Sequence, residues 1–295
     1  MSSLVSIPAT LGHPVMLSPQ KRSAVLLRRF AEMAALAGVT QASRLEVRPA
    51  PARVTTGIQE MDSLTGGLPR GCVTEICGAA SSGRTSVLLS TLASATQRQE
   101  VCALVDTSDA LDPQSALAAG VDLQRLLWVR CGGKNYSPQR HRATQNGAKR
   151  NKTFSAAESI EQALRVLDLL LQSGGFGLVV VDFGDVPFVT ARRIPLASWF
   201  RFQRAVENTP TVMLVIAQAA CAQTCASVVV KLRGKKASDI RRQASGSPGA
   251  MPPHAQLLEG TEIEGELLRS RLERKPVQSV KTTFATHAVR AGRAN

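Results

Sequence analysis

Eight consecutive residues combine glycines, small hydroxyl side chains and a cation in a pattern that binds phosphate. They are Gly78, Ala79, Ala80, Ser81, Ser82, Gly83, Arg84 and Thr85. In the pattern G-x-x-x-x-G-K-[ST], backbone N–H groups of a glycine-rich turn converge on nucleotide phosphates, the lysine reaches the terminal phosphates, and the last hydroxyl binds magnesium. The turn and Thr85 are present here, but the cation is Arg84. The segment therefore predicts a nucleotide-phosphate loop with an altered cation.

The residues on either side of this loop supply the strand and the helix that it requires. Residues 71–77 form a short apolar run introduced by a glycine, and the apolar positions that follow, 87, 88, 91 and 92, have helical spacing. A helix N-terminus adds free N–H donors and partial positive charge where phosphates would lie. A glycine–serine turn without a ligand is the alternative interpretation, and the flanking elements disfavour it.

Carboxylates that could act beside the loop follow two other apolar runs. The run 178–181 ends in Asp182, which predicts a magnesium-shell aspartate near Thr85, or alternatively a turn-forming residue. Hydrolysis also needs a carboxylate that activates water, and Asp106 and Asp109 are available after the run 101–105. Asp112, which precedes Pro113, is expected to cap the next helix.

Composition indicates a soluble chain with a polyanionic partner. The 295 residues are 44% hydrophobic and carry a net charge of +14, which favours nucleic acid. No run is long enough to span a bilayer, and the first 16 residues lack the features of a signal peptide, so we expect a cytoplasmic protein without a membrane partner.

Apolar runs alternate with helical patterns between residues 57 and 233, which predicts an α/β fold with a mainly parallel central sheet flanked by helices. Strands are expected at 71–77, 101–106, 126–131, 178–182, 211–217 and 227–232, and helices at 156–171 and 195–207. We divide the chain into a leader, basic helix and linker (1–54), a nucleotide-binding core (55–233), and a basic linker with a C-terminal β-hairpin and tail (234–295), the hairpin formed by 262–272 and 277–285.

Three basic segments lie around and within the core. Residues 21–38 form an amphipathic basic helix, which could dock on the core or on a neighbouring subunit. Residues 133–153 and 234–253 are basic and are expected to be mobile. The first of these supplies candidate DNA contacts, although it could also be only a solvated loop: Arg140, Arg142, Lys149, Arg150 and Lys152.

The ordered set of motifs resembles the RecA recombinase family over roughly residues 55–233. The resemblance is carried by Thr56-Gly57 with Met61-Asp62, Gly66-Gly67-Leu68-Pro69-Arg70-Gly71, the Ser81-Ser82-Gly83-x-Thr85 loop, Ala110-Leu111-Asp112-Pro113, Gly120-Val121-Asp122-Leu123 and the run ending in Asp182. It implies a RecA-like P-loop core that binds ATP and Mg²⁺, the latter through Thr85 and Asp182, and that acts with DNA. It also implies that Gln218 is the glutamine that senses the terminal phosphate.

Three departures from the family pattern concern catalysis. Arg84 replaces the lysine, and an arginine is longer, planar and forked. Ser108 stands where the family has its catalytic glutamate, and Asp109 is one position out of register, so no catalytic residue is intact and Asp109 is only a weak candidate. Only residues 219–225 separate Gln218 from the next strand, where a recombinase has a long DNA-binding loop.

These losses make the chain similar to the ImuA-like accessory proteins of bacterial mutagenic DNA repair. That similarity implies a nucleotide-binding factor of the DNA-damage (SOS) response that supports error-prone translesion synthesis, with weak or absent ATP hydrolysis. Its expected partners are single-stranded DNA, an error-prone polymerase or a recombinase, and further copies of itself through the N-terminal helix. Two alternatives stay open: an active DNA-dependent ATPase that performs homologous recombination, and a non-enzymatic interaction module.

Overall fold

The computed structural model describes residues 24–26, 28–29, 50–131, 155–234, 260–271 and 280–287. The chain divides into two units, Met1–Pro49 and Ala50–Asn295, and each is described by itself. In the first unit the five described residues are helical, within the helix expected at 21–38, and the rest of that segment lies outside the described residues.

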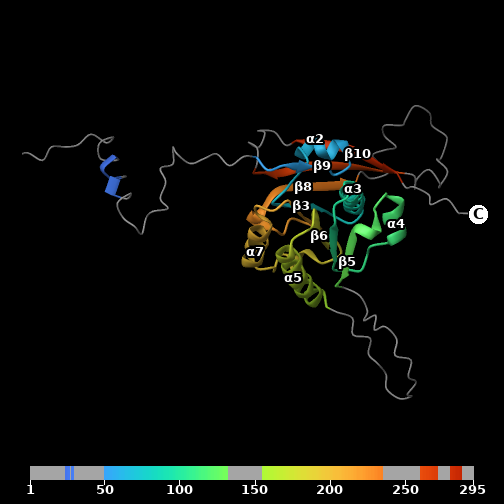
Figure 1. Ribbon diagram of the computed structural model, residues 1–295. Coiled ribbons are helices and arrows are strands. Elements are labelled where there is room, and N and C mark those ends of the chain that lie inside the picture. The colour runs from blue at the N-terminus through green and yellow to red at the C-terminus, as the bar shows by residue number, and fades with distance from the viewer. Residues whose placement is uncertain are drawn as a thin grey trace, which may run out of the picture. The chain divides into compact units, whose positions relative to one another are not determined.

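The second unit is organised around an eight-stranded sheet (Figure 1). Among the described residues its order is β10-β9-β8-β3-β7-β6-β4-β5, and the strands from β8 to β5 run parallel. The strands are β3 (Cys72–Gly78), β4 (Cys102–Asp106), β5 (Leu126–Arg130), β6 (Leu178–Phe183), β7 (Val212–Ala217), β8 (Ala226–Gly234), β9 (Gly260–Ser270) and β10 (Lys281–His287). The predicted α/β architecture with a mainly parallel sheet is confirmed.

Helices cover both faces of this sheet because their apolar faces need a partner. One face is packed by α5 (Ala156–Ser173), α6 (Phe188–Ala191) and α7 (Leu196–Val206), whose Trp199 is fully buried. The other face is packed by α2 (Gln59–Thr65), α3 (Arg84–Gln97) and α4 (Pro113–Ala118). The expected helix starts at Asp112, whose carboxylate accepts from the backbone N–H groups of Gln114 and Ser115 at 3.3 and 3.0 Å.

The C-terminal strands extend the same sheet in antiparallel fashion. β9 pairs with β8, and β10 pairs with β9, which confirms the predicted pairing of the two terminal strands. Ile263, Leu267 and Phe284 of these strands are buried in the core on the α2–α3 side. Among the described elements, helix α2, the short helix α6 and a ladder of β1 (Arg53–Val54) with β2 (Leu68–Pro69) were not predicted from the sequence.

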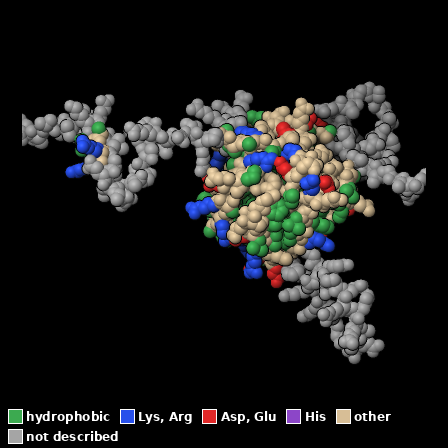
Figure 2. Space-filling model, in the orientation of Figure 1, with side chains coloured by type: hydrophobic (Ala, Val, Ile, Leu, Met, Phe, Trp, Pro, Cys, Tyr) green, Lys and Arg blue, Asp and Glu red, His purple; other side chains and the backbone are tan. Residues whose placement is uncertain are grey.

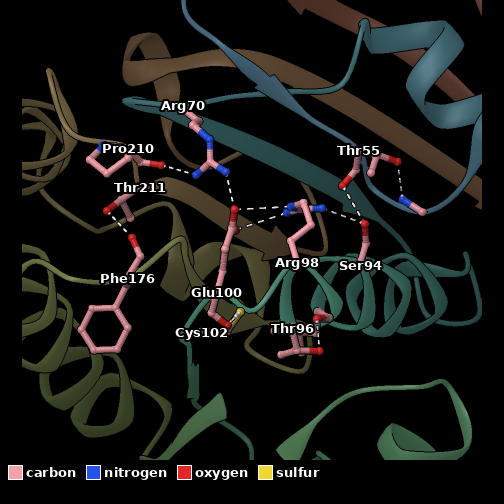
Figure 3. Close-up of polar contacts among 12 residues, drawn as sticks. Thr55, Arg70, Ser94, Thr96, Arg98, Glu100, Cys102, Phe176, Pro210 and Thr211 are labelled. Atoms are coloured by element: carbon pink, nitrogen blue, oxygen red, sulfur yellow. Dashed lines mark hydrogen bonds and ion pairs between the residues drawn. The ribbon is translucent and has the colours of Figure 1, made fainter.

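Polar contacts tie the strand connections together at the amino ends of β4, β6 and β7 (Figure 3). Glu100, just before β4, accepts from both Arg70 and Arg98. Arg70 also donates to the carbonyl of Pro210, and the hydroxyl of Thr211 donates to the carbonyl of Phe176 at 2.6 Å. This edge of the sheet is therefore closed by the protein's own groups, and the predicted site residues lie at the opposite, carboxyl edge.

Charged side chains of the described core do not gather into one stripe on the face shown in Figure 2, where Lys and Arg are scattered among neutral and acidic groups. The predicted DNA contacts Arg140, Arg142, Lys149, Arg150 and Lys152 lie outside the described residues, as do residues 235–253 of the second basic segment. No helix within the described ranges is both long enough and apolar enough to cross a membrane.

Candidate phosphate-binding site

The predicted loop leaves the end of β3 and enters the first turn of α3, and two glycines allow its close packing. A Cβ at Gly78 would lie 2.6 Å from the carbonyl oxygen of Leu232, which is a backbone atom that cannot move aside. Gly83 has a φ of +89°, and a Cβ there would lie 2.0 Å from Cδ1 of Ile263. The loop is thus pressed against β8 and β9 and needs glycine at both positions.

Polar groups of this loop are left without protein partners. The hydroxyl of Ser82 is buried and has no hydrogen-bond partner, so it is available to a ligand on the loop. The first N–H groups of α3 also lack intrahelical acceptors, as at any helix start. Ala79, Ala80, Ser81 and Thr85 are exposed. An anion seated on the loop would satisfy these donors, so the residues present fit a nucleotide phosphate.

Arg84 does not extend into solvent from the loop. Its Nη1 donates to the carbonyl oxygen of Gly184 at 2.9 Å, and the residue is 9% exposed. Gly184 lies two residues after Asp182, in the turn that follows β6. The altered cation of the loop therefore reaches the turn that carries the predicted magnesium-shell aspartate.

Asp182 is half-buried at the end of β6 and its carboxylate accepts from the N–H of Gly184 at 2.7 Å. Burial raises the pKa of Asp182 from 3.8 to about 6, while the Gly184 hydrogen bond lowers it, nearby Asp106 raises it, and nearby Arg84 lowers it. The carboxyl group is thus close to the loop and sensitive to charge, as a group near bound phosphates would be.

The segment that follows β4 has lost the geometry of a catalytic base. The carboxylate of Asp106 accepts from the N–H groups of Ser108, Ala110 and Leu111 at 3.1, 2.9 and 3.0 Å, and from the indole of Trp128 at 3.2 Å. Asp106 therefore holds the turn together. Ser108 offers only a hydroxyl, which cannot take a proton from water at neutral pH.

Asp109 is bound to another side chain. It forms a two-pronged ion pair with Arg130, and that hydrogen bonding lowers the pKa of Asp109 below its ordinary 3.8. A carboxylate with a lowered pKa is a weak base, because efficient general bases have pKa values near the working pH. Asp109 stays a weak candidate for catalysis.

The connection after β7 contains Gln218 and is held by a residue that the sequence analysis missed. Glu75 of β3 is fully buried and accepts from the N–H groups of Cys221 and Ala222 at 2.6 and 3.2 Å. Burial raises the pKa of Glu75, and those two backbone hydrogen bonds lower it. From β9, Arg269 donates to the carbonyl of Gln223. The one signal in the sequence was a lone acid inside the apolar run 72–77.

The structure brings most of the predicted nucleotide residues to one edge of the sheet. The loop 78–85 and Asp182 meet through the contact of Arg84 with Gly184, and Gln218, half-buried, follows β7, the strand between β3 and β6. Thr85 and Asp182 are the residues that could face a magnesium ion. Among the described residues no group of three or more His, Cys, Asp or Glu side chains is arranged to hold a metal.

Comparisons with known proteins bear on the same part of the chain. The family model of the RecA N-terminal domain matches residues 37–133. Protein RecA of Rhizobium rhizogenes is 37% identical over 131 residues, and protein RecA of Brucella abortus is 36% identical over a segment of the same length. These segments cover 44% of this chain and 29% of each relative, so the similarity spans less than a third of the relatives' length.

Proposed function

We propose that this chain, whose residues 37–133 match the RecA N-terminal domain, binds ATP on the Gly78–Thr85 loop. We propose further that it acts in DNA repair as an accessory factor that hydrolyses ATP weakly or not at all. Its place would be the DNA-damage (SOS) response, in support of an error-prone polymerase or a recombinase during translesion synthesis. Within this proposal Gln218 faces the terminal phosphate, and Thr85 and Asp182 are the residues through which Mg²⁺ would be held.

The observation that carries this proposal is the contrast between unpaired phosphate donors and occupied catalytic groups. The buried hydroxyl of Ser82 has no partner, whereas the one carboxylate near the position of a catalytic base, Asp109, is paired with Arg130. Binding depends on the first set and hydrolysis on the second. A chain that keeps one and loses the other is suited to hold a nucleotide as a signal.

The expected loss of rate is large. A positioned general base contributes about 10²–10⁴-fold in typical enzymes, and Ser108 cannot replace one. Phosphoryl transfer depends mostly on electrostatic positioning, and the mobile lysine ammonium that follows the terminal phosphate is replaced here by a guanidinium held at the carbonyl of Gly184. Both losses act on hydrolysis far more than on the binding of phosphates to backbone N–H groups.

DNA binding is proposed through the basic segments. Glu75 and Arg269 form hydrogen bonds with the backbone of the short connection 219–225. These backbone groups are therefore not available to bind a DNA strand. Arg140, Arg142, Lys149, Arg150 and Lys152 remain the proposed contacts to single-stranded DNA, through sequence-independent phosphate binding. The helix at 21–38 is proposed to mediate self-association.

The deciding experiment is a nucleotide titration of the purified chain followed by phosphate-release assays with and without single-stranded DNA. We expect saturable ATP binding and no DNA-stimulated turnover. Turnover stimulated by DNA would instead indicate the recombinase-type ATPase. If ATP does not bind to protein shown to be folded by thermal unfolding, the chain is an interaction module and the proposal fails.

A further inference from the structure

The side chain of Arg84 joins the phosphate loop to the turn after β6. Arg84 is the first residue of α3 and follows Gly83 directly. Its Nη1 donates to the carbonyl of Gly184 at 2.9 Å. With only 9% of the residue exposed, the guanidinium has little freedom to swing into solvent. A permanent positive charge is therefore fixed between the loop and the end of β6.

Gly184 is fitted to this arrangement. A Cβ on Gly184 would lie 3.2 Å from Nη1 of Arg84 and 2.8 Å from Oδ1 of Asp182. Both separations are below ordinary van der Waals contact, so glycine lets the guanidinium and the carboxylate approach the same backbone position. The two groups attract each other through space. The guanidinium acts on the carboxylate from the neighbouring carbonyl of Gly184, without forming a direct ion pair with it.

The charge balance of such a site differs from that of a lysine loop. In the usual arrangement Mg²⁺ bridges the phosphates and is held by the loop hydroxyl and the strand-end aspartate. A guanidinium near that aspartate weakens the attraction of the carboxylate for Mg²⁺ and repels the ion itself. A guanidinium also carries five N–H donors in a rigid fork, and the contact with Gly184 uses one of them. The others can donate to phosphate oxygens.

We propose that Arg84 makes nucleotide binding at this loop independent of Mg²⁺, because its guanidinium supplies the positive charge between the phosphates and Asp182. The ligand class is then a metal-free nucleoside di- or triphosphate. This inference rests on the proposed function, since it concerns how the same loop holds its ligand.

The test is a calorimetric titration of ATP and of ADP into the full-length protein, in excess MgCl₂ and in excess EDTA at matched ionic strength. For the unaltered protein we expect the two dissociation constants of each nucleotide to differ by less than about threefold. For Arg84→Lys, whose compact ammonium cannot span to Gly184 and the phosphates together, we expect EDTA to weaken ATP binding by about tenfold or more.

Gly184→Ala is a second variant that keeps the arginine and crowds its contact, since the added methyl would lie 3.2 Å from Nη1 of Arg84 and 2.8 Å from Oδ1 of Asp182. The new methyl group would displace the guanidinium from Asp182, so we expect EDTA to weaken ATP binding in this variant as well. Because Gly184 has no positive φ, alanine is compatible with its backbone. Gly174→Ala lies on the α5–β6 turn, where a φ of +67° strains alanine although no atom lies within 4 Å of the added methyl. It is the control for backbone strain away from the loop and should keep the Mg²⁺ independence of the unaltered protein.

The outcomes separate this inference from the function on which it rests. ATP binding to the unaltered protein that weakens tenfold in EDTA would overturn the role of Arg84 and leave nucleotide binding in place. Equal Mg²⁺ independence in the unaltered protein and in Arg84→Lys would also overturn it, since the guanidinium would then be irrelevant. No binding of either nucleotide in either buffer, by protein with a cooperative thermal transition, would overturn the proposed function itself.

Discussion

The connections that follow β3 and β7 leave neighbouring parallel strands at the same edge of the sheet. They differ in whether their polar groups have hydrogen-bond partners within the protein. In the loop after β3 the buried hydroxyl of Ser82 has no partner. In the connection after β7, N–H groups of Cys221 and Ala222 are bound by Glu75, and the carbonyl of Gln223 is bound by Arg269.

This difference indicates which connection can bind a ligand and which one has its polar groups already bound by other residues of the protein. Buried polar groups are usually paired, so an unpaired one calls for an explanation. Ser82 is one of several such groups among the described residues, and it differs from the others in lying within the glycine-rich loop, next to the exposed Ser81. A connection whose groups are already paired is a structural tie. The first connection is therefore the part of this edge suited to phosphate, and the second fixes the position of Gln218 relative to β3.

The largest effect is expected at the second connection. Glu75→Ala would leave the N–H groups of Cys221 and Ala222 buried without an acceptor, and each such loss costs about 1–3 kcal/mol. We expect the free energy of unfolding to fall by roughly 2–6 kcal/mol in total, measured by urea denaturation, with faster amide exchange at residues 221 and 222.

Glu75→Gln is the matched control, because its amide keeps one acceptor oxygen and removes the cost of burying a charge. It should lose much less stability than Glu75→Ala. If both variants unfold like the unaltered protein, the connection is not fastened by Glu75, and the contrast between the two connections loses its basis.

The next effect concerns the charge beside the first connection. The raised pKa of Asp182, about 6 against an ordinary 3.8, means that the folded chain keeps a proton between these values that the unfolded chain has released. The contribution of Asp182 to stability is therefore fully present below about pH 4, declines as the pH rises to about 6, and is constant above that. Two pKa units correspond to at most about 3 kcal/mol.

Asp182→Asn should abolish this decline while keeping an acceptor for the N–H of Gly184. The difference in unfolding free energy between variant and unaltered protein, measured from pH 4 to pH 7, should shift in favour of the variant by up to about 3 kcal/mol. Comparing the two proteins cancels the other titrating groups, including Glu75. A difference that stays flat over this range would show that Asp182 has an ordinary pKa.

Close packing of the first connection gives the third prediction. Gly78→Ala would place a methyl group 2.6 Å from the carbonyl of Leu232, and such overpacking costs about 1–3 kcal/mol. We expect a matching loss of stability and weaker ATP binding, because the loop must shift. Gly175→Ala, with φ of +83° but open space around the added carbon, is the control for which binding should not change.

Local patterns predicted much of this fold. The helix cap at Asp112, the strand before the loop and the carboxylate at the end of β6 all depend on residues within one element or its ends, and each was found where the spacing placed it. Helix α2 was missed because it has seven residues and only two apolar ones on its buried face, Met61 and Leu64.

Contacts between distant parts of the chain could not be predicted in this way. Arg84 meets Gly184 a hundred residues away, and Glu75 meets Cys221 after 146 residues. Where a long side chain points depends on which backbone group the tertiary fold brings within reach, and a single sequence does not encode that pairing as a pattern. The loop was therefore recognisable from the sequence, whereas the contact of Arg84 with the carbonyl of Gly184 was not.

The smallest effect is expected in the third connection of this edge, which follows β4. The question is whether its polar groups, like those of the connection after β7, are bound by other groups of the protein. Arg130→Gln removes the partner of Asp109, so the pKa of Asp109, followed by NMR, should rise toward 3.8. Stability should change little, because both side chains reach solvent. ATP turnover should stay at background, since the freed carboxylate extends from a backbone with φ of +57°, one residue beyond Ser108. Phosphate release that appears in this variant would identify Asp109 as a masked base, and the segment after β4 would then be a reversible lock on catalysis.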